Sequence, residues 1–529
     1  MSVSVSAPVA AAALAALCAC QSGSDPTTPW EVRSRPGVQV VGDTVKRRRG
    51  ELPPATSALF DGRAVRLRAA RGEVLGLEVL LERTGPRPVS LDIAAPAAAV
   101  AIQPFEVGFL DVTEPSSDGE SGPSAGPGAY PDILRPASGP VTAADQVFFD
   151  VSVAAAAQPG LYRGELSAGP DRFPVELTVE PVEIHVELEP WLWVWFKSSE
   201  LAREHDLPDD DRPELLAVER AYSDLFRRHG CLLASDYPRE RLARRLALLT
   251  PDVRYWPVAL SKTDTALMAR QTAEWIDFFR GRPQMPFTFT IDEPRRRQRD
   301  EVRRHGEVVH GAGGGPGRLL FSVTDAADPL YRGAVDVFTS PLSIPPPPGW
   351  GPSTHFWTYN GKPPRAGNMT IDKPGTALRT WGWIGARYGV ELWFAWEGLY
   401  YTDRYNRGTQ PTDVLHHPLN YDERRRGDSD WGDWGNGDGL LVYPGPLPSL
   451  RLKALRRGLQ DRLLLRHLAA CGPGGAADAA ALARRLIPAA LGEADAEGGQ
   501  PWPAEEPPWE AARRKILDRI ASRCPQLRR

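Results

Sequence analysis

The sequence predicts a multidomain protein with an N-terminal antiparallel β-sandwich, an irregular (β/α)8 barrel of the TIM type and a small C-terminal helical segment. Three observations support this prediction. The chain has 529 residues, more than one hydrophobic core usually organises. Short apolar or alternating runs fill residues 36–188, whereas apolar runs alternate with helical segments over residues 189–447. Residues 448–529 have mainly helical patterns.

The first twenty residues resemble the signal peptide of a bacterial lipoprotein. Residues 7–17 form an apolar run that is too short to span a bilayer but fits a signal sequence. Leu17-Cys18-Ala19-Cys20 resembles a lipobox, in which Cys20 is lipidated and becomes the mature N-terminus. No Lys or Arg precedes the run, so an ordinary cleaved signal or a disordered tail is the alternative.

This resemblance predicts an exported protein, lipid-anchored to the bacterial cell envelope at the outer membrane or cell surface. Residues 21–35 would be a flexible tether. No later segment is long and apolar enough to cross a membrane, so we expect the lipid to be the membrane attachment.

The predicted sandwich consists of short runs broken by Gly, Pro and Asp. Examples are V-Q-V-V, V-L-G-L-E-V-L-L, V-F-F-D-V-S-V and F-P-V-E-L-T-V. This spacing is typical of antiparallel sandwiches. Residues 115–128 are rich in Ser, Gly and Pro and predict a surface loop, because strand patterns resume after them.

The barrel is predicted from eight apolar runs that read as strands. They span 191–196, 231–235, 255–260, 287–291, 319–324, 335–340, 355–359 and 391–396. Residues 266–279 and 376–387 have apolar side chains at helical spacing between strands. The count of eight favours a closed barrel over an open sheet. Residues 325–334 and the Pro-rich 341–352 are poor helix candidates, so we expect irregularity on that side.

The C-terminal segment begins with a predicted amphipathic helix over 448–470. A Gly/Ala-rich break and a last helix over 508–522 follow, and we expect the segment to pack against the barrel. Cys471 and Cys524 flank the segment after the first helix and can pair in an oxidising compartment. Cys231 lies in an apolar run, which predicts a buried thiol.

Composition restricts the class of partner. The net charge is −4, so no basic excess directs the chain to nucleic acid. The 16 Trp and 13 Tyr suit stacking on sugar rings, although single aromatic residues more often fill cores. We predict no cofactor and no metal site, because His416-His417 has no partners at metal-ligand spacing.

Asp292 and Glu293 are the candidate catalytic pair. They directly follow the fourth predicted strand, and the carboxyl ends of barrel strands are where substrate binds. Two ionised neighbours would repel, so one is expected to keep its proton and act as an acid. This arrangement suits cleavage of a glycosidic bond. Without the barrel context, Asp-Glu-Pro would more simply be a solvated turn.

The mechanism predicted for this pair is substrate-assisted. An ordinary retaining glycosidase needs a second carboxylate about 5 Å away, but the seventh strand ends in none. A 2-acetamido sugar supplies its own nucleophile, with Asp292 orienting the acetamide and Glu293 as general acid and base. Glu397, after the eighth strand, is the rival carboxylate of a conventional mechanism.

Several stretches resemble the catalytic domain of glycoside hydrolase family 123, also catalogued as domain-of-unknown-function family 4091. They include F-T-F-T-I-D-E-P, F-W-T-Y-N, E-L-W-F-A-W and W-G-N-G-D-G-L-L-V-Y-P-G, within residues 190–470. The resemblance implies a β-N-acetylgalactosaminidase that acts on a glycan with N-acetylhexosamine, and it assigns the consecutive catalytic pair to Asp292 and Glu293. The Pro-rich insertion at 341–352 and the Arg-rich one at 422–427 depart from the family and can reshape the pocket.

Other residues near the strand ends are candidate substrate contacts. Tyr359 is placed to donate a hydrogen bond to the acetamide carbonyl, and the remaining candidates are Trp195, Trp357, Asn360, Trp393, Trp396 and Glu397. For each Trp, core packing is the competing interpretation. Asn436 and Asp438 lie in a Gly-rich stretch that favours a structural turn, and R-R-R-Q-R after Pro294 favours a solvated surface.

Two other functional classes stay open. One is a carbohydrate-binding surface lipoprotein that has lost turnover, and the other is a structural or adhesin-like lipoprotein in which the sandwich is the functional part. The intact Asp292 and Glu293 argue against the first. Glycan binding would separate the second from an enzyme.

Overall fold

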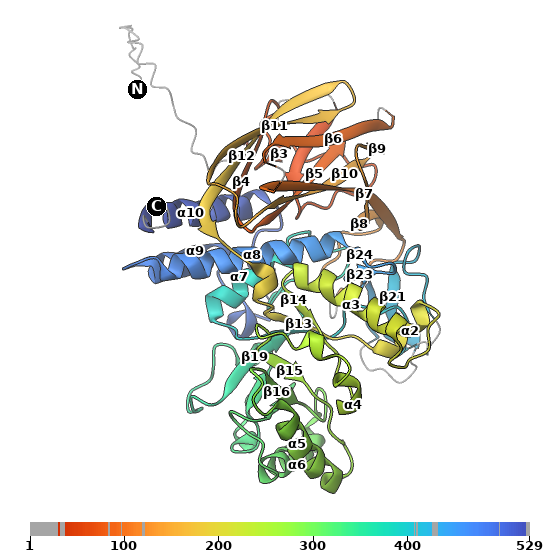
Figure 1. The fold of residues 1–529 in the computed structure, drawn as a ribbon, viewed down its shortest axis with the longest axis vertical. Helices are drawn as coiled ribbons and strands as arrows, with labels where there is room; N and C mark the ends of the chain where they lie inside the picture. The colour runs from red at the N-terminus through yellow and green to blue at the C-terminus, as the bar shows by residue number, and fades with distance from the viewer. Residues whose placement is uncertain are drawn as a thin grey trace, which may run out of the picture.

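The structure is a computed structural model that describes residues 30–31, 37–82, 85–96, 98–118, 122–406, 408, 411–425, 432–496 and 498–524. The predicted signal peptide, the lipidation site Cys20 and nearly all of the tether lie outside the described residues. In Figure 1 the sandwich lies at the top, the barrel at the bottom, and helix α8 crosses between them. No helix in the described ranges is long and apolar enough to cross a membrane.

The sandwich contains two five-stranded sheets, as the alternating runs predicted. One has the order β2 (Val38–Gly42), β5 (Val74–Leu81), β10 (Gln146–Val153), β7 (Val100–Val112), β8 (Gly128–Pro136). The other has the order β4 (Val65–Arg71), β12 (Asp171–Glu183), β11 (Gly160–Ala168), β6 (Arg87–Ala94), β9 (Val141–Ala143). Contrary to a purely antiparallel prediction, β4 and β12 pair in parallel. A small sheet joins β1 (Trp30–Glu31) to β3 (Thr56–Ser57).

All eight predicted barrel strands are present. They are β13 (Leu192–Val194), β14 (Cys231–Leu233), β15 (Tyr255–Pro257), β16 (Met285–Thr288), β17 (Leu320–Val323), β18 (Val337–Thr339), β19 (His355–Tyr359) and β20 (Trp393–Ala395). The sheet order runs from β14 through β13 and β20 down to β15. The eight parallel strands therefore follow one another around a ring in the order of the sequence. Within the fully described stretch 122–406, no ladder joins β14 to β15, so the ring is hydrogen-bonded everywhere except at that seam.

Helices cover the barrel unevenly. The longer connections contain α2 (Ser198–Glu204), α3 (Pro213–Arg228), α4 (Arg239–Leu242), α5 (Thr265–Phe279), α6 (Arg299–Gly311) and α7 (Arg379–Tyr388). Short 3-10 turns are η1 (Val186–Leu188), η2 (Leu246–Leu248), η3 (Arg296–Gln298), η4 (Pro329–Tyr331) and η5 (Pro341–Ser343). The connections after β17 and β18 hold only η4 and η5, which confirms the expected lack of full helices there.

Aromatic side chains fill the interior of the barrel. The Trp193 ring stacks on Phe394 with centroids 4.2 Å apart and meets the edge of Phe287 at 5.0 Å. Phe287 in turn contacts Trp357 at 5.0 Å, and Trp357 contacts Tyr255 at 4.7 Å. The inside of the barrel is therefore a packed core with no pore, and it forms a floor beneath the carboxyl ends of the strands.

After β20 the chain adds short hairpins and then three helices. The hairpins pair β21 (Leu419–Asp422) with β22 (Trp434–Asn436) and β23 (Val442–Tyr443) with β24 (Leu447–Pro448), with η6 (Glu423–Arg425) between the first two. The helices are α8 (Leu450–Ala470), α9 (Gly475–Leu486) and α10 (Pro507–Arg523), with η7 (Leu491–Glu493) before the last. Cys471 and Cys524 form a disulfide that joins the end of α8 to the end of α10, and Cys231 is a buried free thiol as predicted.

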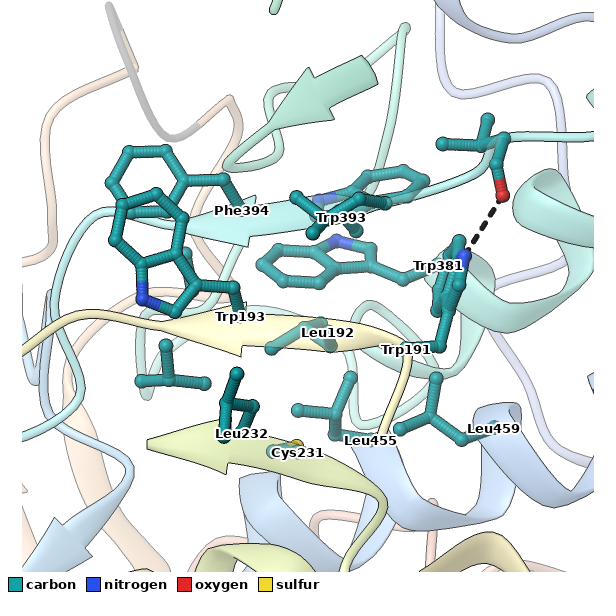
Figure 2. Close-up of a cluster of buried hydrophobic side chains, with 14 of the residues drawn as sticks. Trp191, Leu192, Trp193, Cys231, Leu232, Trp381, Trp393, Phe394, Leu455 and Leu459 are labelled. Carbon is teal, nitrogen blue, oxygen red and sulfur yellow. Dashed lines mark hydrogen bonds between the residues drawn. The ribbon is translucent and has the colours of Figure 1, made fainter. Parts of the chain in front are cut away.

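Two sequence predictions for this segment were wrong. The Gly/Ala-rich break contains α9, because a run of Ala is a strong helix former even between glycines. Helix α8 is not amphipathic, because it is buried on nearly all sides between barrel and sandwich. Its Leu455 and Leu459 pack toward the strands of the barrel (Figure 2). Helix α8 therefore packs against both the barrel and the sandwich.

The charged residues of α8 are buried in ion pairs with the sandwich. Arg451 pairs with Asp132 of β8 at 2.8 Å, and Lys453 pairs with Asp150 of β10 at 2.6 Å. Arg457 pairs with Glu73, between β4 and β5, at 3.0 Å. Unpaired buried charges would be very costly, so these pairs fix how the sandwich sits on the helix.

Candidate active site

The predicted catalytic pair lies just beyond the carboxyl end of strand β16. The strand stops at Thr288, and Asp292 and Glu293 follow on the exposed rim at the carboxyl ends of the strands. The hydroxyl of Thr324, one residue beyond β17, donates to Oδ1 of Asp292 at 2.7 Å. The hydroxyl oxygen of Thr324 also accepts the backbone N–H of Glu293 at 2.6 Å. One neighbouring side chain thus positions both residues of the pair.

Two residues of this rim have a left-handed backbone. Glu293 has φ 44° and Asn360 has φ 48°. Such conformations are unfavourable for residues other than Gly and recur at functional sites. The carboxylate of Glu293 also accepts a hydrogen bond from the Tyr359 hydroxyl at 2.7 Å. Tyr359 ends β19, so the strand geometry brings this predicted residue directly to the catalytic pair.

The period of two along a strand explains which aromatic residues reach the rim. Trp193, Trp357 and Phe394 form the buried floor. The residues two positions later, Trp195, Tyr359 and Trp396, lie on the same face one layer higher. These three are partly exposed, and each donates a hydrogen bond to a carboxylate side chain. Together they form an aromatic wall above the floor.

Asn360 connects Tyr359 to Trp396. Its side-chain oxygen accepts the backbone N–H of Trp396 at 2.9 Å. The indole N–H of Trp396 donates to Oδ1 of Asp438 at 3.3 Å, and its ring lies near Tyr400, Tyr405 and Tyr421 with centroids 4.9, 6.2 and 5.7 Å away. Asn360 therefore fixes the backbone position of Trp396 in the aromatic wall.

Trp195 lies on the β13 side of the rim. Its indole N–H donates to Asp236, in the loop after β14, at 2.9 Å. The Arg404 guanidinium lies 5.1 Å from the centre of its ring. The hydrogen bond with Asp236 fixes the edge of the indole, and the Arg404 guanidinium contacts one of its faces.

Two of the predicted substrate contacts, Trp357 and Trp393, were wrong. Trp357 is 1% exposed in the barrel floor. Trp393 is fully buried on the outer side of β20, where it stacks on Trp381 at 5.0 Å and meets Trp191 (Figure 2). Neither ring reaches the rim, so core packing explains both.

The predicted role of Glu397 was also wrong. Its side chain is fully buried, and it accepts a hydrogen bond from Arg404 at 2.7 Å. Burial raises the pKa of Glu397 to about 7, although the Arg404 charge lowers it. A carboxylate that faces an arginine inside the core cannot contact a sugar. Glu397 instead positions Arg404, which also pairs with Glu200 at 2.7 Å.

Sequence reasoning missed some residues of the rim and interpreted another correctly. Thr324 and Asp236 were not predicted, although each follows an apolar strand and lies at the rim where polar residues are informative. Asn436 is a buried structural residue, as its Gly-rich turn indicated, because its amide donates to the carbonyl of Glu114 at 2.9 Å. No group of three or more His, Cys, Asp or Glu in the described ranges is arranged to hold a metal ion.

Comparison with known proteins identifies a family for part of the chain. Residues 351–468 match the family described as glycoside hydrolase 123, catalytic domain. This segment contains Tyr359, Asn360 and Trp396 but not Asp292 and Glu293, so the pair rests on its position at the rim. No curated protein sequence matches the chain.

Among solved structures, the fold is similar to that of a family 123 glycoside hydrolase from Clostridium perfringens studied for glycolipid glycan hydrolysis. The TM-score is 0.62 at 12% identity, over 93% of this chain and 99% of that one. A GH10 xylanase with a bacterial Ig-like domain from termite gut has a TM-score of 0.29 at 8% identity, over 76% of this chain and 100% of that one. That value is too low to support an argument. Residues 351–468 of this chain therefore contain a glycoside hydrolase 123 catalytic-domain segment, and the chain as a whole has the fold of a family 123 glycoside hydrolase.

Proposed function

We propose that the protein is a retaining, substrate-assisted hydrolase of 2-acetamido sugars, similar to a β-N-acetylgalactosaminidase, with Asp292 and Glu293 as its catalytic residues. The observation that carries the proposal is the joint placement of these two carboxylates. They are exposed side by side at the rim, and the Thr324 hydroxyl bonds to both residues.

In the proposed reaction the acetamide oxygen of the sugar attacks the anomeric carbon. Asp292 accepts the acetamide N–H and stabilises the positive charge that develops on that group, while Glu293 protonates the leaving oxygen. Glu293 then removes a proton from water, which opens the cyclic intermediate with overall retention. Tyr359, now bonded to Glu293, is close enough to donate to the acetamide when substrate enters.

The aromatic wall supports a pyranose as the ligand. Trp195 and Trp396 are partly exposed indoles held by hydrogen bonds, and flat faces of this kind stack on the apolar face of a sugar ring. The burial of Glu397 argues against the conventional alternative that pairs it with Glu293. That alternative would also predict turnover of sugars without an acetamide.

We further propose that the natural substrates are glycans of glycolipids. The support is the similarity of fold to the Clostridium perfringens enzyme studied for glycolipid glycan hydrolysis.

The test compares aryl β-N-acetylgalactosaminide, aryl β-N-acetylglucosaminide and plain aryl β-galactoside. We expect turnover of the acetamido sugars only, inhibition by a thiazoline analogue, and loss of at least about 1000-fold in kcat for Glu293→Gln. Asp292→Asn should lower kcat and weaken thiazoline binding together, since it removes the partner of the acetamide. Glu274→Gln, which changes an exposed carboxylate on α5, is the matched control.

Turnover of the plain galactoside with azide rescue of a carboxylate variant would refute the substrate-assisted route. Glycan binding without turnover of any sugar would instead favour the non-catalytic alternative.

We also propose export and lipid anchoring at Cys20. The Cys471–Cys524 disulfide supports export, because such bonds persist in oxidising compartments. Wild type expressed in a bacterial host should incorporate labelled fatty acid and sediment with membranes, whereas Cys20→Ser should do neither. Equal labelling of both forms would refute the assignment of Cys20.

A further inference from the structure

The arginine run that follows the catalytic pair has no acidic partner. Arg295, Arg296 and Arg297 are exposed. In the described part of the chain none of them forms an ion pair. Three positive charges are therefore available next to the catalytic pair in the sequence.

Exposed leucines lie on the two loops next to this run. Leu330 in η4 is 38% exposed and Leu342 in η5 is 56% exposed. These are the loops after β17 and β18, which the barrel leaves without full helices. Pro345 and Pro346, beyond η5, are also exposed. Large apolar side chains next to unpaired arginines are typical of surfaces that contact lipid layers.

Hydrogen bonds show that these features form one surface. Arg299, next to the arginine run, donates to Asp328 at 3.1 Å and to Asp325 at 3.0 Å. Asp328 caps η4, which holds Leu330. The backbone N–H of Ala327 donates to Ser343 of η5 at 2.8 Å. The arginine run, η4 and η5 are thus adjacent, and Thr324 connects them to the catalytic pair.

We propose that this surface docks on an anionic lipid layer. We call it the rim patch and define it by Arg295, Arg296, Arg297, Leu330 and Leu342. The arginines attract anionic headgroups, and the two leucines enter the headgroup region. Docking brings the carboxylate pair to sugars that lie close to the lipid surface. Lipid binding is independent of the proposed function, but its benefit for glycolipid glycans rests on that function.

The test is sedimentation of the full chain with lipid vesicles, using the unlipidated Cys20→Ser form so that no anchor contributes. Vesicles of phosphatidylcholine alone are compared with vesicles that also contain phosphatidylglycerol, at low and at physiological salt. We expect binding to the anionic vesicles that weakens with salt. Arg295→Gln/Arg296→Gln/Arg297→Gln should weaken it at least about tenfold. Leu330→Ser/Leu342→Ser should weaken it at both salt concentrations, because burial of apolar groups is not screened.

The matched control is Arg484→Gln/Arg485→Gln, two exposed arginines without ion pairs on α9. It should bind vesicles like the parent form. A second measurement compares turnover of a soluble aryl glycoside with turnover of the same sugar on vesicle-borne lipid. The rim patch variants should keep the first and lose several-fold of the second.

Unchanged vesicle binding in the arginine variant would overturn the proposal, as would absence of binding by the parent form. If the parent form ignored vesicles but the arginine variant lost affinity for a soluble sulfated oligosaccharide, the arginines would serve an acidic glycan and the lipid proposal would fail. Vesicle binding without turnover of any sugar would refute the proposed function alone.

Discussion

Thr324 is the residue on which the geometry of the catalytic pair depends most directly. Its hydroxyl is the donor to Asp292 and the acceptor for the Glu293 backbone, at 2.7 and 2.6 Å. Thr324→Val keeps the shape of the side chain but removes both bonds. We expect kcat/KM on the acetamido substrate to fall roughly 10- to 100-fold, because small displacements of catalytic groups are costly. Steady-state kinetics will measure the loss.

Thr324→Ser is the control, since it keeps the hydroxyl and should retain most of the activity. The unfolding midpoint of both variants should stay close to that of wild type, because each of the two hydrogen bonds lost in Thr324→Val contributes only about 1 kcal/mol. Full activity in Thr324→Val would contradict the positioning role.

A second residue-scale prediction concerns pH. Asp43 is buried beside α8, and one of its oxygens has no hydrogen-bond partner. Burial raises its pKa to about 6, although Arg457 and Arg456 lower it and Glu510 raises it further. A carboxyl with a raised folded pKa stabilises the fold below its unfolded pKa, and this stabilisation is lost as pH rises through about 6.

In wild type, the titration of Asp43 should lower the unfolding free energy by up to about 3 kcal/mol between pH 4 and pH 8. Asp43→Asn should abolish this part of the pH dependence, because the amide does not titrate. Urea unfolding of both forms across this range measures it. The pKa of Glu506 is raised to about 7 mainly by burial and further by the Asp43 charge, so Glu506 titrates in both forms and its pKa should be lower in Asp43→Asn. Parallel pH curves for the two forms would refute the assignment.

The sequence predicted Asp292, Glu293, Tyr359 and Trp396 at the rim, because strand ends mark it. It could not separate Trp357 from Tyr359, since both lie on one face of β19 and differ only in depth. Nor could it reveal that Glu397 faces Arg404, a partner supplied by a loop whose path depends on tertiary structure. The burial of a side chain within the barrel and its partners from other loops depend on how the whole molecule packs, so the local sequence does not specify them.

At the scale of elements, helix α8 offers a direct test of buried charge. Arg457 lies between Glu73 and Glu510, with bonds of 3.0 and 2.9 Å. Arg457→Leu leaves both carboxylates in the core without this partner. We expect a loss of about 3–5 kcal/mol in unfolding free energy. Chemical denaturation followed by circular dichroism measures the loss.

Arg466→Leu on the same helix is the matched control. Its ion pair with Glu189 is about half exposed on both sides, so less than about 1 kcal/mol should be lost. Equal losses in the two variants would mean that helix propensity, and not burial, decides the effect.

The strands and long helices were predictable because period and composition specify them locally. The ends of the eight barrel strands and of α5 lie within three residues of the predicted ends. The parallel pairing of β4 with β12 and the gap between β14 and β15 were not predictable, because both depend on contacts between distant segments. The charged positions of α8 suggested a solvated face, whereas their partners lie in the sandwich.

At the scale of the whole molecule, these ion pairs make the sandwich part of the catalytic unit. Asp150 in β10 accepts from Lys453 at 2.6 Å and from Arg456 of α8. The opposite side of that helix packs on the barrel through Leu455 and Leu459 (Figure 2). A change in the sandwich should therefore reach the barrel through one buried helix, and the two should unfold together.

The distribution of tryptophan makes this coupling measurable. None of the 16 Trp lies within residues 36–188, and all but Trp30 follow the sandwich in the sequence. Tryptophan fluorescence therefore reports on the barrel and the C-terminal helices. Far-ultraviolet circular dichroism near the β-sheet minimum includes the sandwich.

We expect Asp150→Asn to leave the Lys453 and Arg456 charges uncompensated and to cost about 3 kcal/mol, a large part of the stability of a typical domain. Both signals should shift to the same lower midpoint, and the temperature at which activity is lost should fall with them. Glu165→Gln, on the exposed surface of β11, should shift neither signal. If Asp150→Asn moved the dichroism midpoint while the fluorescence midpoint and the activity stayed at their wild-type temperatures, the sandwich would be an independent module, and the ion pairs of α8 would not couple it to the catalytic barrel.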